Sequence, residues 1–297
     1  MTFSATEAAF EGFRLVRRRP LTVVFWWLVY VAVFGALFAV AGTSLPGMMV
    51  AVQEMEGKSD PSTAELMALG RTFLGVMSLA MPLGLLASTV LNAAVARAVV
   101  RPAESGWGYL RIGMDELRVL GVSLVLGLAF ILIEVVCFGL LGLLTGLTRA
   151  SGIPMMWVVV VLAGFAAVAF LVWLMVRFSL AIPIVVAERR WALFESFALT
   201  RGHFWPLLGM ALLAWVMTML VALLGGIAAL PVTLTTGGLK GLAAYDGLSA
   251  LELVQVAAPA ILGWVVINAI LSALQLAVMY APFSAAYRGL KGLPDAD

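Results

Sequence analysis

The sequence has little charge and very few side chains that bind metals or act as nucleophiles. Charged residues make up 11% of the 297 residues, and there is one cysteine and one histidine. In soluble domains about a quarter of the residues are charged. The single cysteine, Cys137, excludes an intrachain disulfide and argues against a thiolate metal site. Metal hydrolases, intramembrane proteases and haem proteins need clusters of His, Cys, Asp or Glu, so we expect no catalytic residue, no metal and no cofactor.

Apolar residues are abundant instead, at 63% of the chain, with a mean hydropathy of +1.09. Six stretches reach the ~20 apolar residues that a transmembrane helix needs. Long apolar runs such as 158–170 do not alternate, which excludes the strands of a membrane barrel. The sequence therefore predicts an all-α membrane protein with six spanning helices at Leu21–Ala41, Thr72–Ala96, Val119–Leu147, Met156–Val176, Trp205–Ala229 and Pro259–Ala281.

Basic residues are divided unevenly between the two sides of these spans. Of the 18, only Lys58, Arg71, Arg149 and Lys240 lie in the three outer connections, which leaves 14 on the other side. Because positively charged connections stay in the cytoplasm, both termini are predicted to be cytoplasmic. The first apolar run begins only at Leu21 and lacks a clear cleavage site, so we expect an uncleaved span rather than a signal peptide.

Two segments that precede predicted spans resemble each other. "FEGF" (Phe10–Phe13) and "FESF" (Phe194–Phe197) are each followed by an arginine seven residues after the first phenylalanine, Arg17 and Arg201. A weaker third copy, "YLRIGMDELR", begins at Tyr109. We therefore predict a pseudo-threefold repeat within a single polytopic domain, 1–297, with units of approximately 5–100, 105–187 and 190–288. Each unit would be a cytoplasmic amphipathic helix followed by a membrane hairpin.

The three amphipathic segments are predicted to lie along the cytoplasmic face of the membrane. In the first copy Phe10 and Phe13 fall on one side of a helix, and Glu11 and Arg14 fall on the other. Such a helix places aromatic rings at the acyl boundary and arginines near headgroup phosphates. The alternative is an ordinary helix extension that packs on other cytoplasmic segments. The residues predicted to contact lipid headgroups or the interface are Arg14, Arg17, Arg97, Arg111, Arg177, Arg201 and Trp205.

Glu134 is the one acidic residue within a predicted span, where an ionised carboxylate is costly. On the sixth predicted helix Asn268, Ser272 and Gln275 share one face at i, i+4 and i+7, the last two near the depth of Glu134. This intramembrane polar cluster either lines a path for a solute or proton, or holds helices together through a neutral Glu134 hydrogen-bonded to Gln275. Burial in hydrocarbon favours the neutral form of a carboxyl, which supports the second interpretation.

Two smaller polar features are also present. Ser88 and Asn92 form a short stripe on the second predicted helix, closer to the cytoplasm. His203 follows Arg201 at the start of the fifth predicted helix, where it either senses pH or contacts phosphate, or simply anchors the interface beside Trp205.

The segment Arg177–Gly209 resembles the hallmark segment of bacterial six-span proteins grouped around the glycerophosphoryl diester phosphodiesterase membrane domain. In that group a span ending in an Arg and a Pro is followed by a Glu and then by an amphipathic helix of the Ala-Leu-x-x-Ser-x-x-Leu-Thr-Arg-Gly-x-x-Trp type. The resemblance covers about a ninth of the chain and implies an integral protein of the bacterial inner membrane. The phosphodiesterase domain of some members has no counterpart in these residues, so its activity is not carried over. The residues that match are Arg177, Pro183, Glu188, Ala192, Leu193, Ser196, Leu199, Thr200, Arg201, Gly202 and Trp205.

Together these observations favour a protein that is not an enzyme and that organises membrane lipids, anionic ones above all, or binds a membrane protein partner or a second copy of itself. Nucleic acid is not expected as a partner. The alternative is a transporter or channel for a small or lipid-like molecule, with its polar path around Glu134. A lipid-modifying enzyme is disfavoured because catalytic groups are lacking.

Overall fold

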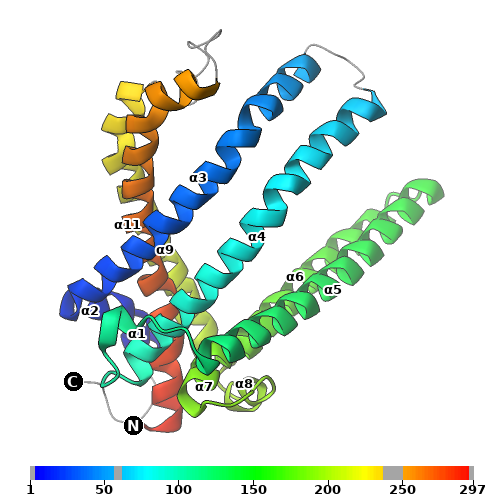
Figure 1. The fold of residues 1–297 in the computed structure, drawn as a ribbon. Helices are drawn as coiled ribbons and strands as arrows, with labels where there is room; N and C mark the ends of the chain where they lie inside the picture. Colours follow the sequence, from blue (N-terminus) through cyan, green and yellow to red (C-terminus); the bar gives the residue numbers. More distant parts are fainter. Residues whose placement is uncertain (1–3, 57–61, 237–249, 294–297) are drawn as a thin grey trace.

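The computed structural model describes residues 4–56, 62–236 and 250–293, and every regular element in these ranges is a helix (Figure 1). Six helices are long and apolar enough to cross a membrane, at the six predicted places. They are α3 (Pro20–Glu56), α4 (Thr63–Val100), α5 (Met114–Ser151), α6 (Met156–Phe178), α9 (Phe204–Thr236) and α11 (Ala250–Lys291). Five short elements precede or connect them: α1 (Ala5–Ala9), α2 (Glu11–Arg18), η1 (Gly106–Tyr109), α7 (Ala181–Glu188) and α8 (Glu195–Leu199).

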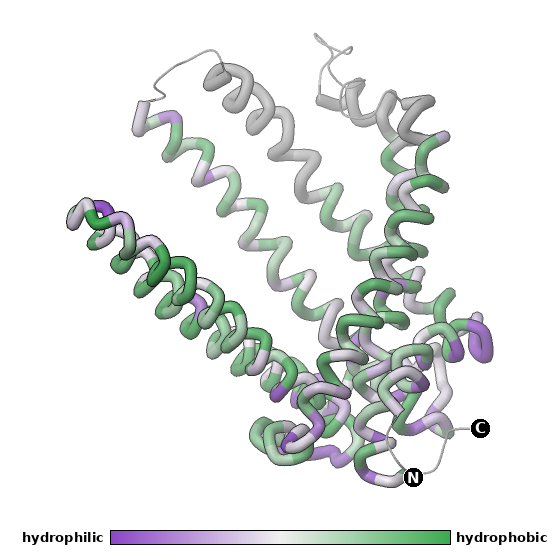
Figure 2. The backbone as a smooth tube through the Cα atoms, turned by 180° about the vertical axis from the view of Figure 1, so that it is seen from behind, coloured by the Kyte–Doolittle hydropathy of each residue, from purple (hydrophilic) through white to green (hydrophobic). Residues whose placement is uncertain are grey.

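The six long helices meet at one end of the molecule and diverge toward the other. Helices α3 and α4, α5 and α6, and α9 and α11 pack against each other, and the α5/α6 pair leans away from the rest (Figure 1). We call the common end, formed by the five short elements and the adjoining ends of the long helices, the base. Helix α1, the first element, and the end of α11, the last, both lie there. Hydrophilic residues gather at the base, and the long helices are mainly hydrophobic (Figure 2).

All the long helices except α6 extend well past the predicted spans. Ser62 caps α4, since its hydroxyl accepts from the Glu65 amide while the Glu65 carboxylate accepts from the Ser62 amide. This cap opens a helix of 38 residues. Hydropathy marks only the apolar part of a helix, whereas backbone hydrogen bonding continues until a cap or a break. Two outer lysines, Lys58 and Lys240, lie outside the described residues.

The predicted amphipathic helix of the middle repeat is not formed as a separate element. Trp107, Gly108 and Tyr109 have φ values of 49°, 69° and 63°, and Gly113 is extended at φ −165°. A helix therefore begins only at Met114, and it is continuous with the span. Glycine is needed at position 108, because a Cβ there would lie 2.6 Å from the Cβ of Phe25.

The chain turns sharply between α6 and α7, within the segment Arg177–Gly209 that carries the family resemblance. Pro183 is the third residue of α7, where the missing amide hydrogen costs no helical hydrogen bond. Arg189, with φ 54°, ends α7 in the left-handed region. The chain then runs into α8, which packs against both α6 and α7. This turn folds the Arg177–Gly209 segment back beneath the spans.

Buried side chains concentrate near the base rather than along the parts of the long helices that extend away from it. Trp26 of α3 is fully buried, and its indole N–H donates to the Gly108 carbonyl at 2.9 Å. Gly12 of α2 lies against the backbone of α11, where an added Cβ would come within 2.5 Å of the Ala277 oxygen. Small residues on α4 allow equally close packing, namely Ala93, Ala94, Ala96 and Ala98. The base is therefore the packed part of the molecule.

The α5/α6 pair contrasts with this core. No residue in the most apolar window of the α5 span is buried, and only 6% of the corresponding α6 window is. Large side chains such as Leu128, Phe138 and Phe165 are exposed along the pair. Surface of this kind requires lipid or another membrane protein to cover it.

Candidate functional site

The centre of the base is a buried ion pair between α4 and α5. Arg97 is 1% exposed and donates to the carboxylate of Glu116, which is 6% exposed, and to the carbonyl of Tyr109. The Arg97 Nε has no hydrogen-bond partner among the described residues. The prediction for Arg97 was contact with lipid headgroups, whereas the structure buries this side chain inside the base. Its side chain turns inward because Glu116 supplies a countercharge that hydropathy alone does not reveal.

Ion pairs at the surface of the base join the α4–α5 connection to the end of α7. Glu104 lies 2.9 Å from Arg111 and 2.8 Å from Arg189, and Arg101 donates to the Ala187 carbonyl at 3.0 Å. Arg111, predicted to bind headgroups, thus has a protein partner, although its side chain is 48% exposed. Arg118 pairs with Asp115, three residues earlier on α5, at 2.9 Å. These contacts hold the α5/α6 pair to the base.

A second charged cluster joins α7 to the end of α11. Glu188 contacts Lys291 at 3.1 Å and Arg190 at 2.5 Å, and accepts from the Tyr287 hydroxyl at 3.1 Å. Arg190 also pairs with Glu195 at the start of α8. The hydrogen bond to Glu188 raises the pKa of Arg190 above its ordinary value, so this guanidinium stays charged at every accessible pH. Glu188, one of the residues of the family resemblance, is therefore held by protein contacts.

The two FExF segments have nearly the same backbone geometry. Phe10 (φ −84°, ψ 0°) and Phe194 (φ −85°, ψ −11°) are the residues before α2 and α8, and each helix begins at the following glutamate. The third position is buried in both: Gly12 lies against α11, and Ser196 is fully buried against α6. The first phenylalanine is exposed in both, at 47% for Phe10 and 77% for Phe194. The whole repeat, with its three units, stays a prediction.

Ser196 explains how α8 is fixed. Its hydroxyl donates to the Arg177 carbonyl at 2.6 Å and accepts from the Leu180 amide at 3.2 Å, so it bridges the turn between α6 and α7. The Arg177 guanidinium lies over the rings of Trp173 and Phe197, at 5.4 and 5.3 Å from their centroids. Its Nε is buried without a hydrogen bond to a described residue. Arg177 thus packs against α8 on the inner side of the base and is not free at the surface.

Other predicted interfacial residues do lie on the outside of the base. Arg17 and Arg201 are exposed, and neither forms an ion pair with any described side chain. Trp205 is 77% exposed and packs edge-on against Phe204. Arg14 is more constrained, because it contacts Glu11 at 3.5 Å and donates to the Glu7 carbonyl. The exposed aromatic residues of these segments further include Phe13, Trp107, Trp191 and Phe194.

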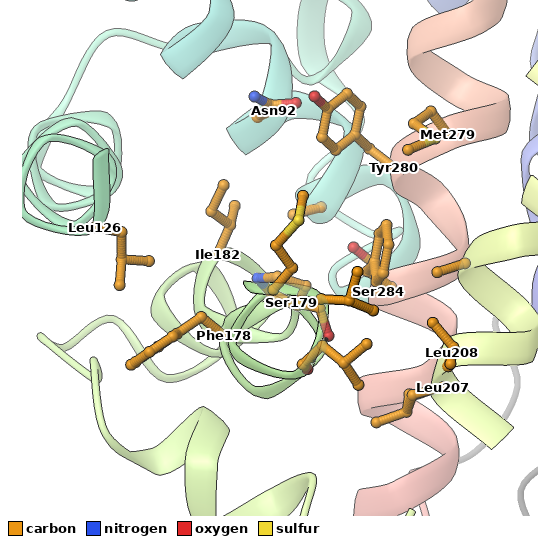
Figure 3. A pocket seen from close by; sticks show the side chains of 17 residues that line it. Asn92, Leu126, Phe178, Ser179, Ile182, Leu207, Leu208, Met279, Tyr280 and Ser284 are labelled. Atoms are coloured by element: carbon orange, nitrogen blue, oxygen red, sulfur yellow. Dashed lines mark hydrogen bonds between the residues drawn. The ribbon is translucent and has the colours of Figure 1, made fainter. Parts of the chain in front are cut away.

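An apolar pocket of about 390 Å³ lies between the α5/α6 pair and the other long helices (Figure 3). Helices α4, α5, α6, α7, α9 and α11 all contribute to its wall, and none of the lining residues is charged. Its volume is within the range of small-molecule sites, about 300–1,000 Å³. The buried Asn92 Oδ1 in its wall has no hydrogen-bond partner among the described residues. Leaving such an acceptor unpaired costs about 1–3 kcal/mol.

The structure does not bring Glu134 together with the polar stripe of the sixth predicted helix. Glu134 is exposed on α5, and the α5/α6 pair leans away from α11 (Figure 1). Asn268, Ser272 and Gln275 are half-buried on α11, and the Asn268 amide donates to the Trp264 carbonyl of its own helix. No hydrogen bond joins Glu134 to Gln275 in the described part of the chain. This arrangement therefore supports neither a polar path through the cluster nor a hydrogen bond between Glu134 and Gln275.

The pocket itself was missed from the sequence, although Asn92, part of the stripe with Ser88, lies in its wall. The polar residues of α11, Asn268, Ser272 and Gln275, do not line it, whereas Met279, one turn after Gln275, does. The polar stripe of α4 was therefore the available signal, but the place of Asn92 at a pocket depends on how the helices pack. Among the described residues no group of three His, Cys, Asp or Glu side chains could hold a metal ion.

Comparison with known proteins adds no relative at this point. No family model matches the chain, no curated protein matches it, and no solved structure matches it. The resemblance of Arg177–Gly209 to the glycerophosphoryl diester phosphodiesterase membrane domain group stays a prediction from that segment. The functional conclusion therefore depends on the geometry of this chain, an all-helical protein with six candidate membrane spans gathered on a charged base.

Proposed function

We propose that this chain is a non-enzymatic protein of the bacterial inner membrane that organises anionic lipids, or a partner protein, at the cytoplasmic leaflet. Its base would lie at the headgroups, and its six long helices would cross the bilayer as three hairpins. The observation that carries the proposal is the set of exposed aromatic rings and unpaired exposed arginines around the base.

The two FExF segments supply the clearest part of this surface. Phe10 and Phe194 project from the same position of equivalent helices, and Arg17 and Arg201 follow each at seven residues. The exposed part of a phenylalanine ring gains no protein contact, whereas at a membrane interface it gains hydrocarbon contact. An exposed guanidinium without a protein carboxylate is free to meet a lipid phosphate with its fork of donors.

Charge distribution supports the same orientation. The basic residues of the described ranges lie mainly at the base, and only Arg71 and Arg149 belong to the predicted outer connections. The cytoplasmic leaflet is anionic, and each lysine or arginine near such a surface contributes ~1 kcal/mol. The first helix, α1, and the end of the last, α11, lie at the base, so both termini would be cytoplasmic.

The exposed α5/α6 pair accounts for the partner-binding part of the proposal. This pair presents apolar side chains such as Leu132 and Leu140 over most of its length. Another membrane protein or a second copy of this chain could pack on it through the same side chains that otherwise contact lipid. The transport alternative gains no comparable support, because Glu134 lines neither the apolar pocket beside Asn92 nor the pocket between Glu188 and Lys291.

The experiment measures lipid preference in reconstituted protein. Purified chain in nanodiscs would be mixed with trace dansyl-labelled phosphatidylglycerol or phosphatidylcholine, and energy transfer from its tryptophans would report lipid enrichment. We expect enrichment of phosphatidylglycerol that falls as salt rises from low to physiological strength. The Arg17→Gln/Arg201→Gln double variant should lose up to ~2 kcal/mol of this preference, from ~1 kcal/mol for each arginine.

The control is Arg149→Gln, which removes an exposed arginine at the opposite end of α5. It should leave the preference for phosphatidylglycerol unchanged. Equal enrichment of both lipids by the unaltered protein, or an unaltered preference in the double variant, would reject docking through the base.

A further inference from the structure

We propose that the pocket between the α5/α6 pair and helices α4, α9 and α11 binds an uncharged amphiphile, a hydroxyl group on a long hydrocarbon chain. This ligand class goes beyond docking at anionic headgroups, and the two proposals fail independently. Most of the pocket wall comes from the long helices where they adjoin the base, so its ligand would enter from the bilayer.

The pocket wall excludes charged ligands. Its 17 lining residues include no Lys, Arg, His, Asp or Glu, and most are Leu, Val, Ile, Met, Phe or Ala. A phosphate or carboxylate entering it would lose its hydration without gaining a countercharge, which is prohibitive in hydrocarbon. A hydrocarbon chain, in contrast, meets apolar side chains on every side, from Leu126 of α5 to Leu208 of α9 (Figure 3).

Two polar groups specify where a ligand hydroxyl would bind. Asn92 Oδ1 is buried in the wall and accepts no hydrogen bond from a described residue. Tyr280 of α11 also lines the pocket, and Figure 3 shows its hydroxyl turned toward the side that carries Asn92. A ligand hydroxyl can donate to Asn92 and accept from Tyr280 at the same time. An ether or hydrocarbon lacks the donor that the Asn92 oxygen requires.

Two serines are the other polar residues of the wall, Ser179 and Ser284. The Ser179 hydroxyl donates to the Val176 carbonyl at 2.8 Å, so its proton is already committed. The Ser284 hydroxyl can itself donate or accept, so it does not specifically require a ligand donor. The Asn92 oxygen does require one, and with Tyr280 it is the pair that distinguishes an alcohol from other apolar molecules.

The test compares two probes that differ by one hydrogen-bond donor. Full-length protein in detergent would be photolabelled with a diazirine analogue of oleyl alcohol, and unlabelled oleyl alcohol or its methyl ether would compete. We expect the alcohol to compete about five-fold better than the ether, the effect of one hydrogen bond. Oleate should compete poorly at neutral pH, and peptide mapping should place the label near Met175 or Met279.

Variants separate the polar pair from the apolar volume. Tyr280→Phe removes one exposed oxygen and should weaken alcohol competition about three-fold while leaving the ether unchanged. Asn92→Leu should make the alcohol and ether equal. Ala211→Phe fills the pocket and should abolish labelling there. Ser88→Leu, one turn from Asn92 and outside the lining, is the matched control and should change nothing.

Unfolding temperature and elution volume would establish that each variant is folded. If Asn92→Leu does not fold, Tyr280→Phe still tests the proposal. Equal competition by the alcohol and the ether against unaltered protein would overturn the proposal. Labelling spread along the outer faces of α5 and α6 and insensitive to Ala211→Phe would also overturn it.

Discussion

The guanidinium of Arg97 and the carboxylate of Glu116 form an ion pair inside the base, with 1% and 7% of their side chains exposed. Arg97 also binds the Tyr109 carbonyl, so one side chain of α4 holds both the start of α5 and the connection before it. This contact determines where the α5/α6 pair leaves the base. The contact matters for stability because it is buried, and removing either partner would leave an unpaired charge in the interior.

Glu116→Ala should therefore destabilise the protein strongly. It leaves the Arg97 charge buried without a partner, at a cost of about 3–5 kcal/mol. The thermal unfolding midpoint in detergent, followed by tryptophan fluorescence, would measure this. Arg111→Ala is the control, because its side chain is 48% exposed and its pair with Glu104 contributes at most about 1 kcal/mol. Similar losses in both variants would contradict the role given to Arg97.

Gly12→Ala should loosen α2 from α11. The added Cβ would lie 2.5 Å from the Ala277 oxygen and the Val278 Cα, and backbone atoms cannot yield as a flexible side chain would. We expect a loss of about 1–3 kcal/mol and faster tryptic cleavage at Arg17. Gly84→Ala in α4 is the matched control: no atom lies within 4 Å of its added Cβ, so alanine should stabilise by about 0.5–1 kcal/mol. An unchanged cleavage rate in Gly12→Ala would show that this contact is dispensable.

Glu134→Gln should leave stability within about 0.5 kcal/mol of the unaltered protein, as for other surface substitutions. Glu134 is exposed on α5 and hydrogen-bonds to no described residue, so its carboxyl holds no other helix in place. The same unfolding measurement tests this, with Ser196→Ala as the positive control. That variant leaves the Leu180 amide unpaired and should cost about 1–3 kcal/mol. A large loss in Glu134→Gln would restore the interpretation that Glu134 joins helices.

Much of the fold was predictable because the hydrophobic effect acts on composition over long windows. Six apolar runs are enough to predict six long helices, since a chain in lipid must satisfy its backbone within each helix. Local signals were also sufficient for the cap at Ser62 and for the pairing of Arg118 with Asp115, because both involve residues three apart. The equivalence of Phe10 and Phe194 could be seen from four letters.

The site depended on contacts between residues far apart in the chain. Arg97 and Arg17 are both arginines beside an apolar span, yet one is buried against Glu116 and the other is exposed. Nothing local distinguishes them, because the countercharge comes from another helix. The same holds for Asn92, whose stripe was visible but whose pocket exists only where six helices converge. Hydropathy and local spacing thus fixed what each segment is, whereas packing across helices set which polar groups face lipid, protein or an apolar pocket.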